Sequence, residues 1–134
     1  MAIEELLRVV APPEHPLETG IAAQWEEVER LLGTRLPRDL YDFATHYGSG
    51  IFVCPLGLWI LNPFAPWYQD QLQGCSEPLR AYRGLPARYG TPYGVFPDRP
   101  GWLLWGKTSN GDSLCWVTEG EPEAWPLLLI SRLY

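Results

Sequence analysis

The chain has 134 residues, of which 46% are hydrophobic and 19% charged, a composition that excludes intrinsic disorder and suffices for one domain with a buried core. Its formal net charge of −6 disfavours binding to a nucleic-acid backbone, which depends on Lys and Arg, and suits either plain solubility or the attraction of a basic partner. The three cysteines, Cys54, Cys75 and Cys115, are odd in number and lack zinc-site spacing, so we expect reduced thiols in a cytoplasmic protein.

Apolar residues at helical spacing predict three amphipathic helices in the first half of the chain, over residues 3–10, 21–32 and 37–47. The first segment is too short and too charged for a secretory signal peptide. No run of the sequence approaches the ~18 apolar residues of a membrane-spanning helix. The residues expected to form the buried stripes are Ile3, Leu6, Leu7 and Val10 in the first helix, Ile21, Trp25, Val28 and Leu32 in the second, and Leu40, Phe43, Ala44 and Tyr47 in the third.

Turn-forming residues predict the ends of these helices. Thr19 or Gly20 is expected at the N-cap of the second helix. Gly33 is expected after its last turn, because glycine readily adopts the left-handed conformation found there. Gly48 and Gly50 together predict that the third helix stops and the chain turns.

The middle of the chain predicts a short hairpin, one further helix and a long loop. Residues 51–53 and 58–61 are apolar runs separated by Pro and Gly, which predicts two strands joined by a tight turn. A further helix is expected over residues 68–83. Residues 84–101 are rich in Pro and Gly and predict a surface loop with one short strand at residues 93–96.

The last third of the chain predicts a three-stranded antiparallel meander, with strands at residues 102–108, 113–118 and 125–131. Asn110 and Gly111 separate the first two strands, and both tolerate the positive φ that a two-residue type I′ turn requires. A longer loop with Gly and Pro precedes the third strand. The predicted fold class is therefore α+β, a mostly antiparallel sheet packed by N-terminal and central helices.

Alternation within the meander assigns its side chains to faces. The middle strand is apolar on both faces, so we expect it to be covered on both. The run Leu127–Ile130 is apolar throughout and needs cover, or it becomes a sticky sheet edge. The side chains expected to share a face are Leu103, Trp105 and Lys107 in the first strand, and in the second Leu114 with Trp116, opposite Cys115 with Val117.

Few residues suggest catalysis. His46 and Cys54 lie close enough in the sequence to leave a Cys–His pair open, but no third orienting residue accompanies them, and a surface histidine is the simpler interpretation. Gly106-Lys107-Thr108 ends like a phosphate-binding loop, yet it lacks the upstream glycine and lies in a predicted strand. The seven tryptophans mostly fall at core positions, which favours packing over stacking on bases or sugars. No metal-ligand cluster or cofactor motif is visible.

The motifs of the chain resemble, in their order and spacing, those of the SUKH superfamily, the Smi/Knr-type domain, over residues 21–130. The resemblance implies an α+β fold with helices packed on a mostly antiparallel sheet. The matching positions are Trp25, Glu29-x-x-Leu32-Gly33, Leu36-Pro37-x-Asp39-Leu40, Phe43, Tyr47-Gly48-Ser49-Gly50, Asn62-Pro63, Trp105-Gly106, Asn110-Gly111-Asp112, Cys115-Trp116 and Trp125-Pro126.

The resemblance implies a non-catalytic protein-binding domain. Bacterial members of the family are mostly cytoplasmic immunity proteins that bind and neutralise a toxin domain, often a nuclease, delivered by neighbouring cells. Fungal members are regulatory scaffolds, so a general regulatory module without a toxin partner is the alternative. No catalytic residue set is shared by the family, and neither a cofactor nor a membrane or nucleic-acid contact is implied.

A basic toxin would be attracted by carboxylates, which raise association rates and add specificity. The sequence predicts one acidic patch at the ends of the two hairpins, with two aromatic anchors beside it; a merely solvated loop is the alternative. The residues expected to bind the partner are Asp112, Glu119, Glu121 and Glu123, with Trp67 and Tyr68 as the anchors.

The chain departs from the family pattern at its end. We expect a single domain over residues 1–134, but family members generally continue after the last strand into a further segment, often a short helix with an apolar face. This chain ends at Tyr134. Either it is a short member, or the segment is missing and part of the sheet beside Leu127–Ile130 is left uncovered.

Overall fold

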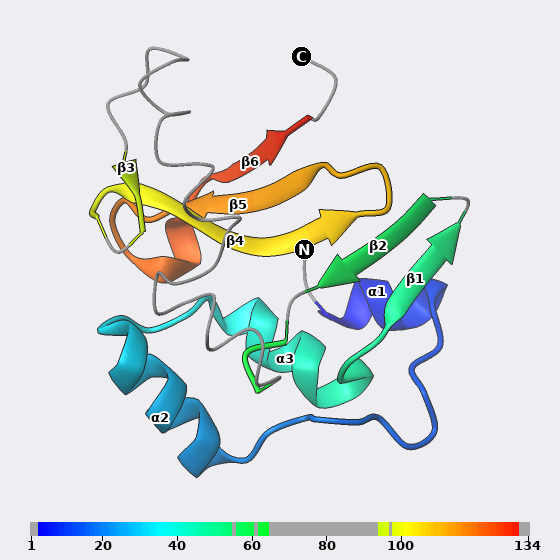
Figure 1. Cartoon of the computed structure of the whole chain (residues 1–134). Helices are drawn as coiled ribbons and strands as arrows, with labels where there is room; N and C mark the ends of the chain where they lie inside the picture. Colours follow the sequence, from blue (N-terminus) through cyan, green and yellow to red (C-terminus); the bar gives the residue numbers. More distant parts are fainter. Residues whose placement is uncertain (1–2, 55, 61, 65–93, 97, 132–134) are drawn as a thin grey trace.

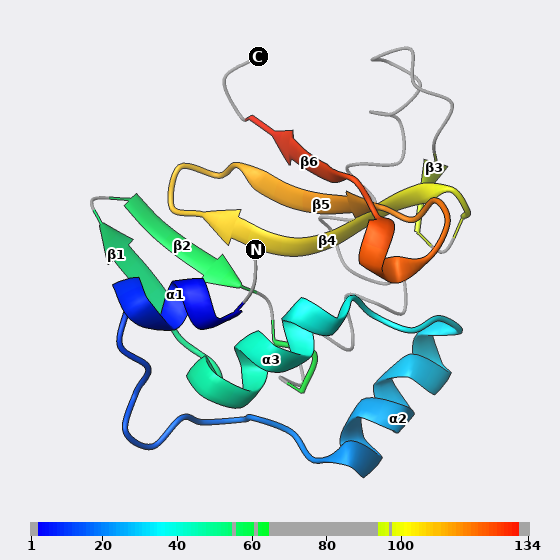
Figure 2. The same cartoon turned by 180° about the vertical axis from the view of Figure 1, so that it is seen from behind.

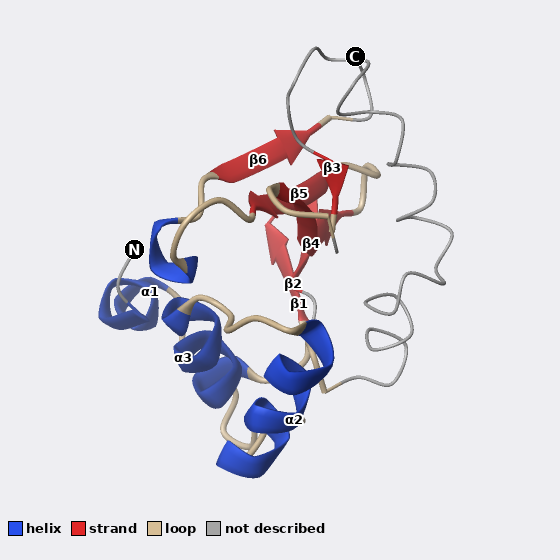
Figure 3. Ribbon diagram, turned by 90° about the vertical axis from the view of Figure 1, so that its left-hand side faces the viewer, coloured by secondary structure: helices blue, strands red, loops and turns tan. Residues whose placement is uncertain are grey.

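The computed structural model of the chain describes residues 3–54, 56–60, 62–64, 94–96 and 98–131. In this part of the chain, helices pack on one side of a mostly antiparallel sheet (Figures 1 and 3), so the predicted α+β class is confirmed. The helix predicted over residues 68–83 lies outside the described residues.

Three α-helices occupy the first half of the chain at the predicted places: α1 (Ile3–Val9), α2 (Ala22–Leu32) and α3 (Arg38–Tyr47). Trp25, Val28 and Leu32 on α2 are buried as expected, whereas Ile21, expected in the same stripe, is 67% exposed at the N-cap. Helix α1 buries none of its side chains fully, although its apolar stripe faces α3 and the sheet. Among the described helices, none is long and apolar enough to cross a lipid bilayer.

The start of α2 differs from the prediction of Thr19 or Gly20 at its N-cap. The N-cap residue is Ile21, whose backbone N–H donates to the side-chain oxygen of Gln24 at 2.9 Å. A glutamine at this third helical position reaches back to the cap N–H, so the helix begins two residues later than Thr19 would place it. At the other end Gly33 has φ 71° and donates to two carbonyls of the last turn, as predicted.

The strands are β1 (Ile51–Cys54), β2 (Leu56–Ile60), β3 (Gly94–Val95), β4 (Gly101–Thr108), β5 (Ser113–Val117) and β6 (Leu127–Ile130). The sheet has the order β1-β2-β4-β5-β6, with neighbours antiparallel, and β3 pairs parallel with β4 (Figure 2). The two predicted units, an early hairpin and a C-terminal meander, are confirmed, as is the short strand predicted near residue 94. A single 3-10 turn, Pro122–Ala124, joins the last two strands.

Two clusters of buried side chains lie on opposite faces of the sheet, which confirms that β5 is covered on both. Trp116 faces the helices and is 5% exposed, whereas Cys115 faces the other way and is 1% exposed. The helix-side cluster contains Trp25, Val28, Leu32, Leu36, Leu40, Ala44, Phe96, Leu103, Trp116 and Trp125. The cluster on the opposite face contains Trp102, Leu104, Cys115, Val117 and Ile130, with Leu128 against it.

The turn between β4 and β5 is not the predicted type I′ turn. Gly111 has φ 89°, but Asn110 does not have positive φ. The Gly111 N–H donates to the Thr108 carbonyl at 3.0 Å, and the Thr108 N–H donates to the Asp112 carbonyl at 3.1 Å. This is a three-residue loop with one left-handed glycine, which needs only a single positive φ.

A β-bulge in β4 overturns the prediction that Lys107 shares a face with Leu103 and Trp105. The pairing with β5 shifts by one residue between Leu104 and Gly106, so Trp105 is the extra residue. One extra residue reverses the alternation that follows it. Lys107 therefore pairs with Ser113 on the face of Cys115, where its positive charge acts on the Cys115 thiol.

Candidate protein-binding surface

The four carboxylates predicted to form one acidic patch are not brought together. Asp112 follows the turn between β4 and β5, whereas Glu119, Glu121 and Glu123 lie in the connection between β5 and β6. These two connections are at opposite ends of β5 (Figure 1). A five-residue strand spans roughly 17 Å, so Asp112 cannot join the other three in contacting one small feature of a partner.

Asp112 braces the hairpin turn. The Thr108 hydroxyl donates to its carboxylate at 3.0 Å, and the Asp112 backbone N–H donates to the same hydroxyl at 3.1 Å. This reciprocal pair is a local side-chain and backbone motif that fixes the turn conformation. The position of Asp112 is thus explained by the fold.

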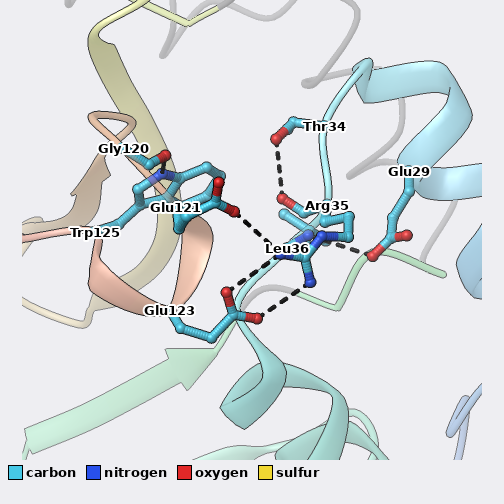
Figure 4. A network of polar contacts seen from close by, with 8 residues as sticks. All are labelled: Glu29, Thr34, Arg35, Leu36, Gly120, Glu121, Glu123 and Trp125. Carbon is cyan, nitrogen blue, oxygen red and sulfur yellow. Dashed lines mark hydrogen bonds and ion pairs between the residues drawn. The ribbon is translucent and has the colours of Figure 1, made fainter.

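Glu121 and Glu123 flank one guanidinium (Figure 4). Arg35, in the link between α2 and α3, lies 3.3 Å from a carboxylate oxygen of each. The hydrogen bond to Glu123 raises the pKa of Arg35 above its usual value, and the negative charges of Glu123 and Glu121 add to this effect. The two carboxylates tie the connection before β6 to the helical layer, and Arg35 offsets part of their negative charge.

The remaining part of this connection is also held in place. The indole N–H of Trp125 donates to the Gly120 carbonyl at 3.1 Å, and the Trp125 ring is buried in the helix-side cluster (Figure 4). Glu121 and Glu123 still have 83% and 48% of their side-chain surface exposed, so they remain accessible to a partner. The predicted anchors Trp67 and Tyr68 lie outside the described residues.

Of the two residues considered for a catalytic pair, His46 contacts the backbone of its own helix. Nδ1 of His46 lies 2.8 Å from the Asp42 carbonyl oxygen, one helical turn earlier. The side chain of Cys54 is outside the described part, so a Cys54–His46 pair stays a prediction. Across residues 3–54, 56–60, 62–64, 94–96 and 98–131, His, Cys, Asp and Glu side chains form no group that could hold a metal ion.

Cys115 is unsuited to act as a nucleophile at neutral pH. Burial raises the pKa of its thiol from 9.0 to about 12, and the positive charge of Lys107 opposes this rise. Since the folded protein holds the thiol proton more tightly than the unfolded chain, the contribution to stability is complete below pH 9. It is lost as the pH rises from 9 towards 12.

We expect iodoacetamide at pH 8 to leave Cys115 unmodified in the native protein and to alkylate it after unfolding in guanidinium. The protonated, buried thiol is both a poor nucleophile and inaccessible. Peptide mapping by mass spectrometry reads each of the three cysteines separately. Alkylation of Cys115 in the native protein at the rate of the unfolded chain would contradict the burial described here.

An open apolar groove of about 290 Å³ lies between the helical layer and the sheet. It is formed by α1 and α3 on one side and by side chains of four strands on the other. Among the described residues that line it, Asp39 is the only one with an ionisable side chain. The lining residues are Ile3, Leu6, Asp39, Leu40, Phe43, Ile60, Trp105, Trp116 and Leu127.

The strands at the two edges of the described sheet, β1 and β6, expose large apolar side chains. On β6, Leu127 and Leu129 are 70% and 62% exposed, and Leu127 also lines the groove. On β1, Val53 is 72% exposed and Ile51 45%. The all-apolar run of β6 was the sequence signal for the first of these surfaces. The groove itself was missed, although an amphipathic first helix without a partner of its own was a weak indication.

Comparison of the chain with protein-family models, with curated proteins and with solved structures gave no match.

Proposed function

We propose that this chain is a non-catalytic, cytoplasmic protein-binding domain. The observation that carries the proposal is the exposure of Leu127 and Leu129 on a strand at the sheet edge, beside an apolar groove. Contiguous exposed apolar surface on a soluble domain commonly marks a site where another macromolecule docks. Partner binding would remove these side chains from water.

The resemblance of its motifs to the SUKH superfamily supports a more specific role, that of an immunity protein that neutralises a cognate toxin by covering it. The net charge of −6 supports a basic toxin, such as a nuclease, because opposite charges accelerate association. A regulatory module that binds a cellular protein is the alternative. A neighbouring gene for a large secreted protein with a variable C-terminal domain favours immunity, and its absence favours the module.

Co-expression with the toxin domain encoded beside it tests the immunity role. Cells that carry both proteins should grow, and the purified pair should elute together. Growth no better than with an empty vector excludes immunity against that toxin. If His46→Ala and Cys54→Ala together protect as well as the unaltered chain, protection does not depend on a Cys–His pair.

Charge neutralisation in the connection before β6 should slow association with a basic partner. We expect a rate constant roughly fivefold lower at low salt and a smaller salt dependence, because the local negative potential is reduced. Stopped-flow fluorescence measures the rate. The variant carries Glu119→Gln, Glu121→Gln and Glu123→Gln, and a control with equal net charge carries Glu14→Gln, Glu18→Gln and Glu26→Gln. Equal slowing in both variants would show that only total charge matters.

A further inference from the structure

Among the described residues, part of the backbone of strand β6 has no hydrogen-bonding partner. The Val117 N–H donates to the Pro126 carbonyl at 2.9 Å, which makes Val117 and Pro126 a hydrogen-bonded pair of the antiparallel ladder. Such pairs alternate with pairs that exchange no hydrogen bonds. In the register of β5 and β6, Leu127 and Leu129 belong to the pairs that exchange no hydrogen bonds.

The N–H and C=O groups of Leu127 and Leu129 therefore point away from β5. Strand β6 ends the order β1-β2-β4-β5-β6, and in the described structure no strand pairs with its outer side. Four backbone groups are thus available to an incoming strand. Natural proteins usually prevent strand addition by placing a charged residue or a proline in an edge strand. Strand β6 contains neither.

The free edge and the apolar groove form one continuous surface. Leu127 belongs to both, since it lies on the edge strand and lines the groove. It pairs with Trp116 in the register of β5 and β6, and Trp116 also lines the groove. A strand added to β6 would place every second side chain on this face of the sheet, towards the groove.

The negative charge of Asp39 favours an incoming strand that carries a basic side chain. Asp39 lines the groove, is exposed, and has no ion-pair partner in the described part of the chain. A carboxylate at an apolar rim favours a Lys or Arg side chain over an acidic one. The net charge of −6 acts in the same direction and disfavours pairing of β6 with a second copy of the chain.

From these observations we infer that β6 and the adjoining groove bind an extended segment of a partner protein by strand addition. The segment alternates apolar side chains and carries a basic residue that reaches Asp39. Backbone hydrogen bonds provide affinity in such complexes, and the pockets for alternate side chains provide specificity. The inference rests on the proposed function and names the surface and the chemistry of the partner.

The test uses a displayed library of random ten-residue peptides selected against the whole chain. We expect enriched peptides with period-two apolar alternation and a Lys or Arg. A synthetic copy of one such peptide is then titrated by fluorescence polarisation. Peptides with helical periodicity, or the absence of any specific binder, would overturn the inference.

Leu129→Pro removes one outward N–H of β6 and places the proline ring where an added strand would lie, while the hydrogen bonds to β5 remain. We expect peptide affinity to fall at least tenfold. The matched control is Val53→Pro on the other edge strand. The Ser109 N–H donates to the Gly57 carbonyl, so the backbone N–H and C=O of Gly57 point towards β4. The backbone N–H and C=O of Val53, which pairs with Gly57, therefore point away from β2, to the outer side of β1. This control should bind within twofold of the unaltered chain.

Further variants complete the test. Asp39→Asn should weaken a basic peptide severalfold and leave a neutral analogue unchanged. If Leu129→Pro does not fold, as judged by circular dichroism, Leu127→Asn and Val53→Asn form the equivalent pair, with at least fivefold weakening expected only for the first. Equal binding by both members of a pair, or greater weakening at Val53, would overturn the assignment to β6.

Two experiments distinguish a failure of this inference from a failure of the proposed function. A chain that dimerises in analytical ultracentrifugation and becomes monomeric through Leu129→Pro would show that β6 binds a second copy, which overturns the inference. A cognate toxin that is neutralised equally by the unaltered chain and by Leu129→Pro also overturns it, yet leaves the proposed function standing. Loss of neutralisation with Leu129→Pro, and not with Val53→Pro, supports both.

Discussion

Gly48→Ala is expected to destabilise the fold by more than about 3 kcal/mol, a large part of the roughly 5–15 kcal/mol that stabilises a domain. Gly48 has φ 62° and ψ −146°, a conformation essentially restricted to glycine. A Cβ there would lie 2.8 Å from the backbone nitrogen of Leu17 and closer still to its carbonyl oxygen. Both atoms belong to the backbone, and the Ser49 N–H donates to that carbonyl at 2.8 Å, so relieving the clash would disturb this hydrogen bond.

The control is Gly50→Ala, two residues further along the same turn. An added Cβ at Gly50 has no neighbour within 4 Å, and its φ is not in the left-handed region. We expect its free energy of unfolding to stay within about 0.5 kcal/mol of the unaltered chain. Urea denaturation followed by tryptophan fluorescence measures both. Similar values for the two variants would contradict the close approach of the backbone at Gly48.

Asn62→Ala is the second substitution with a large expected effect, about 2–4 kcal/mol. Asn62 is 6% exposed. Its amide donates to the Glu18 carbonyl and to the Ser49 hydroxyl, both at 2.9 Å, and its side-chain oxygen accepts the Phe64 N–H at 2.9 Å. Removing the side chain leaves these groups without their partner in a largely buried site.

Thr45→Ala provides the comparison for Asn62→Ala. The Thr45 hydroxyl donates to the Tyr41 carbonyl at 2.9 Å, but on the exposed side of α3. Water can replace that hydrogen bond, so a change below about 0.5 kcal/mol is expected. Chemical denaturation curves distinguish the two cases. If Asn62→Ala were as mild as Thr45→Ala, Asn62 would not hold the loop at Glu18 to the turn after α3.

The elements that were predicted correctly are those with strong local periodicity. The stripe of Trp25, Val28 and Leu32 identifies α2 because burial of one helical face repeats every 3.6 residues. The opposed faces of β5 follow in the same way from a period of two. Both patterns are properties of consecutive residues, so no knowledge of distant contacts is needed.

The candidate site was predicted less well, because it depends on registers and on contacts between distant segments. Four carboxylates were expected together, yet Asp112 lies at one end of β5 and the glutamates at the other. Nothing in the sequence indicated that Arg35 pairs with Glu121 and Glu123, which are more than eighty residues away. The all-apolar run of β6 predicted a strand that needs cover, and the structure shows Leu127 and Leu129 exposed there.

The sequence by itself therefore determined the α+β class, the three described helices, the early hairpin and the C-terminal meander, since these depend on local propensity and periodicity. Tertiary structure alone decided three further points: the bulge at Trp105 that turns Lys107 to the other face, the difference between Gly48 and Gly50, and the union of β6 with the groove. Each depends on which backbone lies against which. These contacts depend on how segments far apart in the chain pack together, so the pattern of neighbouring residues does not predict them.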